Sequence, residues 1–343
     1  MLVLILVLLG ISFLILIHEA GHFWAAKKCN MKVEEFGFGL PPRILGFKRG
    51  ETIYSINLLP FGAFVRIAGE SDLENIQNNI DLKDRQRYFY YQSAKNRAFV
   101  TVAGILANFL IGWVLISSSL AIGRPFSIIV TDVFPNSPAF EAGFQKNDLI
   151  LGYQTENELR NFILNNPNKE VEFRIKRGDK EKNINVKIIE KDGKGFLGIY
   201  FVGGEIPKQR IDKAFIRGFL YSLEIFKLNA YGIYVFLSNL FTHGKIIDGV
   251  VGPVGIVNFS KQVGEISLVY LLNLLGIISV SLAFMNFLPF PALDGGRLLF
   301  ILIEKIRGKS LSLKLESIIN GIGFVLLLIL IIFITFRDIK KIF

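Results

Sequence analysis

The chain has 343 residues, of which 51% are hydrophobic, and a formal net charge of +10. Its mean hydropathy of +0.45 excludes an ordinary soluble protein of two or three domains and favours a membrane protein. The basic residues are spread along the chain among acidic ones, so we expect contacts with the lipid bilayer and no nucleic-acid partner. The single cysteine, Cys29, excludes an intramolecular disulfide and a cysteine-based metal cluster.

The first segment, residues 1–26, is apolar and predicts a transmembrane helix. Met1 to Ile17 contains no charged residue, so it lacks the basic region of a secretory signal peptide. Extended to residue 26, the segment can span roughly 30 Å of hydrocarbon. Three further segments are apolar over a similar length, and we predict transmembrane helices within 98–122, 263–303 and 312–338.

Residues 27–97 have the pattern of a β-region. Apolar residues recur in Arg43–Phe47 and in Thr52–Leu58, and the turn-forming run Lys48–Glu51 separates the two stretches. This arrangement predicts a β-hairpin. The preceding Phe36-Gly37-Phe38-Gly39 places glycines where the backbone must approach another group closely.

Residues 123–204 predict a small soluble α/β domain, in which β-like runs surround one polar helical stretch, Glu156–Asn166. Residues 205–262 follow as an amphipathic segment. Its central part, Ala214–Phe241, is apolar in patches but is interrupted by charged residues such as Arg217. That pattern favours a helix in the membrane interface, and partial insertion remains an open alternative.

The orientation of the chain follows from its basic residues. Lys27, Lys28 and Lys32 come directly after an uncharged N-terminal segment, so the positive-inside rule places the first loop in the cytoplasm. Four spans then place both termini and the α/β domain outside the membrane. Lys305, between the last two spans, agrees with this orientation, whereas Arg337 near the C-terminus opposes it.

His18-Glu19-Ala20-Gly21-His22 is an HExxH pattern near the end of the first predicted span. Two imidazoles four residues apart share one face of a helix and can bind one Zn²⁺, with the carboxylate of Glu19 beside them as a general base. Short patterns also occur by chance. Ionisable groups in an apolar helix are costly, however, unless they have partners or face water, so a functional site is the stronger interpretation.

Asp294 is the candidate third ligand, because two histidines leave a catalytic zinc short of one protein ligand, and Asp294 is the one other ionisable residue with unusual surroundings inside a predicted span or at its edge. It follows Pro289 and Pro291, which interrupt the third predicted span, and precedes Gly295 and Gly296, which permit close backbone packing. Irregular backbone at membrane depth is tolerated where it is buried in protein or lines a cavity. A solvated aspartate at a helix end is the alternative interpretation.

These two motifs, in this order, resemble the site-2 protease family of intramembrane zinc metalloproteases, specifically the bacterial regulator-of-sigma-E-protease type. The resemblance covers nearly the whole chain and implies a polytopic α-helical membrane protein with four transmembrane helices, a membrane-associated β-region and one soluble PDZ-like α/β domain. Ser137-Pro138-Ala139 and Asn147-Asp148-Leu149 carry the PDZ resemblance. Asn147 stands where glycine is common, and asparagine enters the left-handed region easily enough for such a turn.

The resemblance also implies substrates and further site residues. Gly37, Phe38 and Gly39 are similar to the glycine-containing β-region that pairs with substrate as an added strand. Asn108, in a segment where Ile105 replaces the usual proline, and Asn286 are candidates for binding the oxyanion or the substrate backbone. Both asparagines fit equally well as polar residues satisfied between helices.

By the same resemblance, the expected reaction is hydrolysis of peptide bonds in the transmembrane segments of single-span proteins. Trimmed anti-sigma factors and signal-peptide remnants are the implied substrates. A peptide C-terminus is a possible partner of the PDZ-like domain, which would read that C-terminus or filter substrates by size. The implied location is the bacterial inner membrane, with the active site near the cytoplasmic side. Gly252-Pro253-Val254-Gly255-Ile256 also resembles a family segment, but its residues suggest no chemistry.

Two other functions are compatible with parts of this pattern. A non-proteolytic membrane adaptor with a PDZ domain would explain the soluble domain, but it would have no use for Glu19 between two histidines. A metal transporter would carry ligands across the full depth of the membrane and would not need a peptide-binding domain. The compact set of candidate ligands favours the protease.

Overall fold

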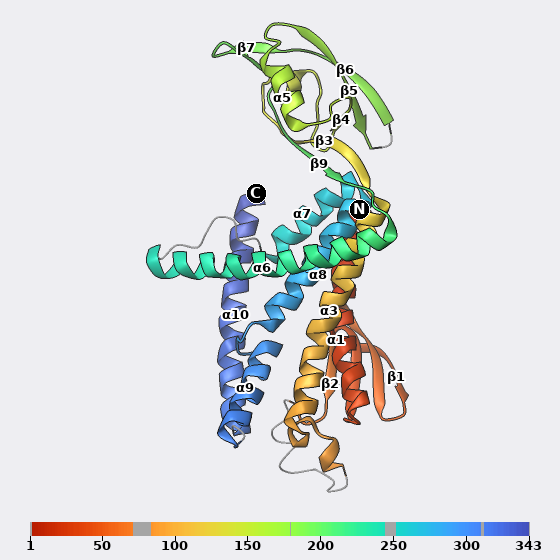
Figure 1. Ribbon diagram of the computed structural model, residues 1–343, viewed down its shortest axis with the longest axis vertical. Coiled ribbons are helices and arrows are strands. Elements are labelled where there is room, and N and C mark those ends of the chain that lie inside the picture. The colour runs from red at the N-terminus through yellow and green to blue at the C-terminus, as the bar shows by residue number, and fades with distance from the viewer. Residues whose placement is uncertain (1, 71–83, 179, 244–251, 310–311, 343) are drawn as a thin grey trace. The chain divides into compact units, whose positions relative to one another are not determined.

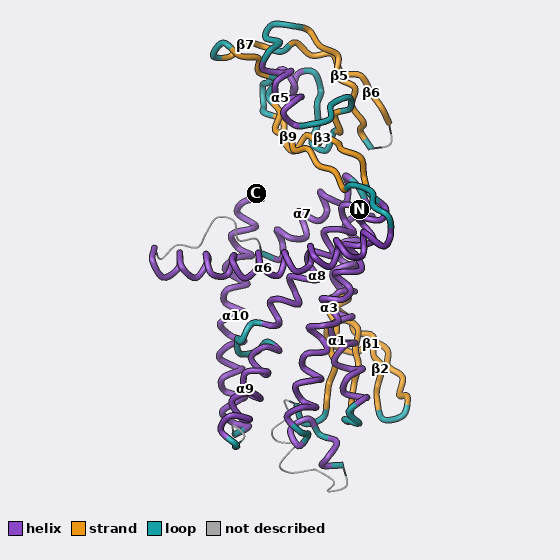
Figure 2. The backbone as a smooth tube through the Cα atoms, viewed as in Figure 1, coloured by secondary structure: helices purple, strands orange, loops and turns teal. Residues whose placement is uncertain are grey.

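The computed structural model describes residues 2–70, 84–178, 180–243, 252–309 and 312–342. The chain divides into two compact units. The first, here called the helical unit, comprises residues 1–117, 215–260 and 273–343. The second, here called the β-rich unit, comprises residues 118–214 and 261–272. Figure 2 shows the strands of the β-rich unit and the long helices of the helical unit.

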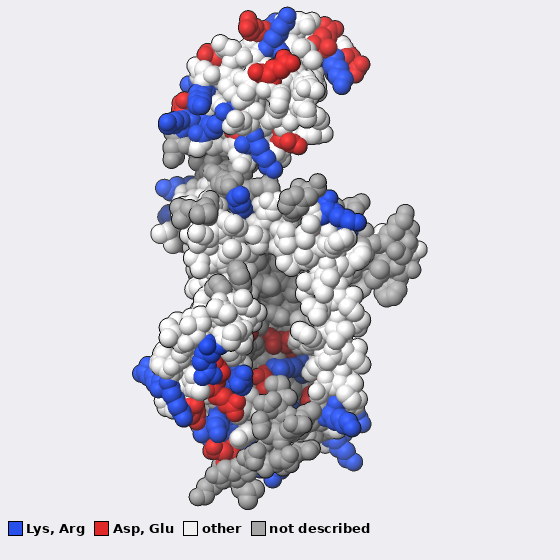
Figure 3. Space-filling model, turned by 180° about the vertical axis from the view of Figure 1, so that it is seen from behind, with Lys and Arg blue, Asp and Glu red and all other residues white. Residues whose placement is uncertain are grey.

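Four of the described helices are long and apolar enough to cross a membrane, which confirms the four predicted spans. They are α1 (Leu2–Lys28), α3 (Ala94–Ile122), α8 (Leu268–Phe287) and α10 (Leu313–Ile342). Only 11% of the most apolar stretch of α10 is buried inside the protein. The side chains of this stretch are therefore suited to face lipid. The face of the helical unit in Figure 3 has a broad band without charged side chains, and charges gather at the end that holds the start of α3.

The segment predicted as one transmembrane helix over 263–303 is interrupted in the structure. Residues up to Ile266 belong to α7 (Pro253–Ile266), the membrane candidate α8 ends at Phe287, and α9 (Asp294–Arg307) begins a new helix. The residues between α8 and α9 include both prolines, which lack a backbone donor and clash with a continuing helix. The proline break was predicted, whereas the extension of a single span to residue 303 was wrong.

Two long strands form the β-region, β1 (Val33–Arg49) and β2 (Thr52–Ile67). Their register shifts divide them into four paired segments. The segment 33–38 pairs with 63–67, and part of it also pairs with 53–56, while 43–49 pairs with 52–57 across the predicted hairpin turn. The hairpin is therefore confirmed, but it belongs to a larger sheet whose outer segments are 43–49 and 63–67.

The outer part of this sheet exposes large apolar side chains. Leu45 and Phe47 are 64% and 66% exposed, and Ile56 and Leu58 are more than half exposed. An exposed apolar surface of this kind is suited to contact with lipid. At the opposite end, a cluster that includes Ala25, Met31, Val33 and Val100 attaches the sheet to α1 and α3. Two short 3₁₀ turns, η1 (Arg85–Arg87) and η2 (Phe89–Tyr91), precede α3.

Five strands of the β-rich unit form one sheet in the order β6-β5-β4-β3-β9. They are β3 (Arg124–Val133), β4 (Leu149–Ile150), β5 (Glu170–Arg177), β6 (Lys180–Lys187) and β9 (Ile199–Ile206). The same unit contains α4 (Pro138–Glu141), α5 (Glu156–Leu164) and the small hairpin β7 (Ile189–Lys191) and β8 (Lys194–Phe196). Phe173 and Leu159 are buried in its core. Asn147 has φ +72°, which confirms its predicted left-handed turn.

The predicted amphipathic segment 205–262 contains α6 (Ile211–His243) and the start of α7. Helix α6 is not one of the four candidate spans, and Figure 1 shows it lying across the long helices. The indole Nε1–H of Trp113 donates to the carbonyl of Phe215 at 2.8 Å, and Asn229 donates to Ser281 at 3.1 Å. These contacts attach α6 to α3 and α8.

Helix α7 begins against α10. The carboxylate of Asp338 accepts hydrogen bonds from the backbone N–H groups of Gly252 at 3.2 Å and Gly255 at 2.8 Å. The first N–H groups of a helix have no partners within the helix, and a carboxylate there also interacts favourably with the helix dipole. Asp338, on another helix, therefore caps the glycine-rich segment for which the sequence suggested no chemistry.

Candidate metal centre

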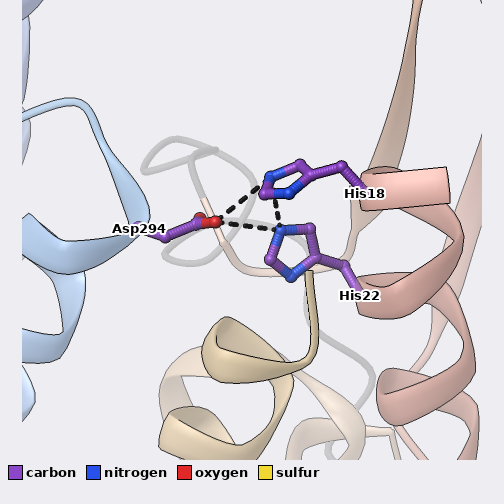
Figure 4. A group of neighbouring side chains, drawn as sticks. All are labelled: His18, His22 and Asp294. Atoms are coloured by element: carbon purple, nitrogen blue, oxygen red, sulfur yellow. Dashed lines mark hydrogen bonds and ion pairs between the residues drawn. The ribbon is translucent and has the colours of Figure 1, made fainter. Parts of the chain in front are cut away.

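His18 and His22 lie on one face of α1, as their spacing requires. Each residue is 8% exposed. The helix continues through this region because residues 2–28 contain no proline and few β-branched residues in succession. Figure 4 shows the two imidazoles pointing from α1 toward Asp294, which stands at the start of α9. The HExxH helix and the proline-broken segment therefore meet, although 272 residues separate His22 from Asp294.

Asp294 is placed by the close packing of the chain around Gly295 and Gly296. Both glycines are buried. A Cβ at Gly295 would lie 2.6 Å from the carbonyl carbon of Leu288, and a Cβ at Gly296 would lie 2.8 Å from that of Phe290. Only glycine allows the first turn of α9 to pack this closely on the preceding loop. The two glycines thus hold the carboxylate at a defined depth beside α1.

Three ligand atoms converge on one point. The Nε2 atoms of His18 and His22 are each 3.2 Å from Oδ2 of Asp294, and they are 3.2 Å from each other. A tetrahedral ion with metal–ligand distances of about 2.0–2.1 Å holds its ligand atoms about 3.3–3.4 Å apart. The observed separations are close to that value, so the three side chains fit a zinc ion without rearrangement. Among the described residues they also form the one group of three or more potential metal ligands.

The proton on His22 is fixed by a backbone contact. Its Nδ1 lies 2.8 Å from the carbonyl oxygen of Val100 on α3. A carbonyl can only accept, so Nδ1 carries a proton, and whenever the ring is neutral Nε2 presents its lone pair toward Asp294. Oδ2 of Asp294 is itself buried and receives no hydrogen bond from the described residues. With the ring in its neutral form, two acceptors face each other in a buried site, an arrangement that a cation between them would satisfy.

Glu19 follows His18 on α1, and one of its carboxylate oxygens is fixed by the β-region. Oε2 accepts a hydrogen bond from the backbone N–H of Val65 at 3.0 Å. Val65 belongs to the outer segment 63–67 of the sheet. This contact attaches the HExxH helix to a strand. It could not be predicted from the sequence, because a backbone donor leaves no pattern in the residue types.

The predicted strand-pairing residues are not at an edge of the sheet. Gly37 pairs with Phe64 on one side and with Ser55 on the other, and Phe38 is likewise paired on both sides. The expected addition of a substrate strand at Gly37 and Phe38 is therefore wrong, because a strand segment already pairs with each of them on both sides. Gly39 has φ +81° and accepts a hydrogen bond from the side chain of Asn57 at 3.1 Å.

The two predicted asparagines occupy different surroundings. Asn108, on α3, is 1% exposed, and its Nδ2 lies 3.4 Å from Nδ1 of His18. Asn286 is half-buried in the last turn of α8, before the proline break. Among the described residues, the structure thus brings Asn108, but not Asn286, within reach of a metal-ligand side chain.

Two ion pairs near the site were missed from the sequence. Arg297, three residues after Asp294, pairs with Glu70 at the end of the β-region. Arg97, near the start of α3, pairs with Glu304 on α9. Charged residues in or beside predicted spans could have drawn attention to Arg97, Arg297 and Glu304, but not to Glu70. Their pairing could not have been predicted, since the partners are separated by 227 and 207 residues.

Comparison with known proteins gives a consistent result. The profile of Peptidase family M50 matches residues 6–330. The zinc metalloprotease RasP of Geobacillus kaustophilus is 29% identical in an alignment of 411 positions that covers 96% of each chain. The regulator of sigma-W protease RasP of Bacillus subtilis is 28% identical in an alignment of 412 positions, which also covers 96% of each chain. The matched residues include all three metal ligands, His18 and His22 on α1 and Asp294 on α9. The chain therefore belongs to Peptidase family M50, the site-2 protease family, and is a zinc metalloprotease.

Proposed function

We propose that the chain hydrolyses peptide bonds at a zinc centre formed by His18, His22 and Asp294, with Glu19 as its general base. The observation that carries this proposal is the convergence of three ligand atoms at mutual distances of 3.2 Å beside Glu19. Bound zinc would polarise the substrate carbonyl and lower the pKa of a coordinated water toward neutrality. The protein must then supply a base, and Glu19 is the adjacent carboxylate.

Glu19 would accept the proton of the attacking water and deliver it to the departing amine nitrogen. The N–H of Val65 fixes Oε2, so the carboxylate cannot turn freely away from the site. With Nε2 unprotonated, His18 and His22 would each direct a lone pair toward the ion, and the carboxylate of Asp294 would balance part of its charge. Asn286, near the proline break, remains our candidate for a hydrogen bond to the substrate backbone.

The substrates that we propose are transmembrane segments of single-span proteins, such as trimmed anti-sigma factors or signal-peptide remnants. One supporting observation is the name of the relative from Bacillus subtilis, a regulator of sigma-W protease. A transmembrane helix hides its peptide bonds in internal hydrogen bonds, so it must unwind before cleavage. An outer segment of the β-region can replace the lost bonds, and 63–67 is the segment in contact with Glu19.

We propose that residues 123–204 form a PDZ-like domain. The five-stranded sheet with β9 at its edge, and α5 beside that edge, support this assignment. The side chain of Glu156 on α5 accepts a hydrogen bond from the N–H of Gly203 on β9 at 2.6 Å, and Arg160 lies over the ring of Phe201. These contacts occupy the space beside β9, which favours a size filter over a reader of peptide C-termini.

We place the protein in the bacterial inner membrane, with the metal centre toward the cytoplasmic side. Lys27 and Lys28 end the helix that carries both histidines, and basic residues favour the cytoplasmic side of a span. The exposed apolar side chains of the hairpin, among them Leu45 and Phe47, support attachment of the β-region to the same membrane surface. Helix α6 would lie in the opposite interface.

Cleavage of a single-span model substrate by purified protein in detergent tests the proposal, with zinc content measured in parallel. The wild-type protein should cut, and Glu19→Gln should keep its zinc and lose cleavage by a factor of at least about 100. His22→Ala should lose both zinc and cleavage. A Glu19→Gln variant that cuts at the wild-type rate would remove Glu19 from the mechanism.

A further inference from the structure

Asn108 is a buried polar residue whose surroundings differ from those of a substrate-binding group. It lies on α3, is 1% exposed, and its amide faces Nδ1 of His18 at 3.4 Å. Its Oδ1 is buried and has no hydrogen-bond partner among the described residues. A buried carbonyl oxygen without a donor costs about 1–3 kcal/mol, so an explanation within the site is required.

His22 shows how an acceptor at Nδ1 orients a metal-binding imidazole. Nδ1 of His22 donates to the carbonyl of Val100, also on α3, and this contact directs the lone pair of Nε2 toward Asp294. His18 must present its Nε2 in the same form to bind the same ion. It therefore also needs an acceptor at Nδ1, and Asn108 is the residue that lies there.

We propose that Asn108 is a positioning residue for zinc, turned so that its Oδ1 accepts a hydrogen bond from Nδ1–H of His18. This proposal rests on the proposed zinc centre. A half-turn about the Cβ–Cγ bond exchanges the amide oxygen and nitrogen, which are nearly equal in size. The half-turn gives the partnerless oxygen a donor and leaves Nε2 of His18 with a free lone pair.

The two orientations of this amide correspond to two tautomers of His18. With Nδ2 toward His18, Nδ1 must accept and Nε2 carries the proton, which suits a direct hydrogen bond to Asp294. With Oδ1 toward His18, Nε2 is free to bind metal. Asn108 thereby links the state of the ring to the presence of the ion, through an amide that never contacts the ion.

The backbone at Asn108 is held independently of this amide. Ser279 on α8 donates its hydroxyl to the carbonyl oxygen of Asn108 at 2.8 Å. Ser279 belongs to α8 and is fully buried where that helix contacts α3. Substitution of Ser279 removes a buried contact of the same helix turn but leaves the amide beside His18 intact. It is therefore the matched control.

The test is the zinc dissociation constant of the full-length protein in detergent, measured by competition with a chelator. Asn108→Leu keeps the approximate size of the side chain and should weaken zinc binding by about 10- to 100-fold. Asn108→Asp supplies a carboxylate acceptor and should bind zinc within about threefold of the wild type. Ser279→Ala should bind as the wild type does. The Co²⁺-loaded Asn108→Leu protein should show an altered visible spectrum, which a purely structural role for Asn108 would not produce.

Three results would overturn the proposal. In the first, the folded Asn108→Leu protein binds zinc as tightly as the wild type, while His22→Ala does not bind it; the zinc centre then stands and Asn108 has no part in it. In the second, Asn108→Asp loses as much affinity as Asn108→Leu. If Asn108→Leu does not fold, the comparison of Asn108→Asp with Ser279→Ala still decides. In the third, His22→Ala retains the zinc, which overturns the proposed centre and the role of Asn108 together.

Discussion

Arg97 on α3 donates from its Nη2 to both carboxylate oxygens of Glu304 on α9, each at 2.7 Å. The side chain of Arg97 is 7% exposed and that of Glu304 is 24% exposed. Because α9 begins with Asp294, this ion pair joins the helix that provides one ligand to the helix that supports both histidines.

Removal of one member of this pair should therefore loosen the metal centre as well as the fold. We expect Arg97→Ala to lower the free energy of unfolding by roughly 3 kcal/mol, since it leaves a carboxylate mostly buried without its partner. Thermal unfolding in detergent measures this effect. The reversed pair, Arg97→Glu with Glu304→Arg, should recover part of the loss. If the single variant unfolds at the wild-type temperature, the pair does not hold α9.

Arg297 makes a second connection from α9, in this case to Glu70 at the end of the β-region. We expect Arg297→Gln to reduce cleavage more than it reduces stability, because it lets Asp294 move relative to the strand that holds Glu19. Cleavage rate and unfolding temperature, measured on the same preparation, separate the two effects. Arg297→Lys is the conservative control and should retain more activity. Equal activity of Arg297→Gln and wild type would contradict this role.

Gly104, on α3, has no side chain and so leaves room for the imidazole ring of His22. A Cβ at this position of α3 would lie 2.5 Å from Cε1 of the His22 ring, which is closer than real contacts allow. Gly104→Ala should therefore displace the imidazole and weaken zinc binding by at least about tenfold. Gly232→Ala, on α6, meets no atom within 4 Å and is the matched control. Unchanged zinc affinity in Gly104→Ala would show that the ring can move without loss.

Glu51, at the hairpin turn, should make the β-region sensitive to acid. Partial burial opposes its ionisation, but hydrogen bonds from Lys27 and Arg87 outweigh burial and hold the pKa of Glu51 below its ordinary value of 4.5. A lowered pKa in the folded state stabilises the fold above the unfolded pKa, and that stability is lost as pH falls through the folded pKa. Between about pH 5 and pH 3, the unfolding temperature of the wild type should fall more than that of Glu51→Gln. Parallel curves would argue against this contribution.

Asp338 caps a helix to which it does not belong. Asp338→Ala should destabilise the helical unit by about 1 kcal/mol, the usual cost of losing a helix cap. Asp338→Asn keeps an acceptor and should lose less. Hydrogen exchange at the start of α7 is the most direct measurement, since the amides of Gly252 and Gly255 lose their partner. Protection of these amides in Asp338→Ala equal to that in the wild type would refute the cap.

The sequence predicted the parts of the site that depend on local rules. The helical spacing of His18 and His22 and the proline break before Asp294 identified the three side chains that the structure brings together. The position of Gly37 could not be predicted, because the chain returns after residue 59 to pair a second time with β1. That return depends on register and side-chain packing over the whole sheet, and the alternation of residues in the hairpin does not encode it.

The cap on α7 has a consequence for the order in which the protein is made. Gly252 leaves the ribosome 86 residues before Asp338. At about 5–20 residues per second, roughly 4 to 17 s pass before the carboxylate exists. During that interval the start of α7 has no acceptor from α10. Helix α10 is synthesised after α7, so a later helix completes an earlier one, and the start of α7 reaches its final hydrogen bonding only after Asp338 has been made.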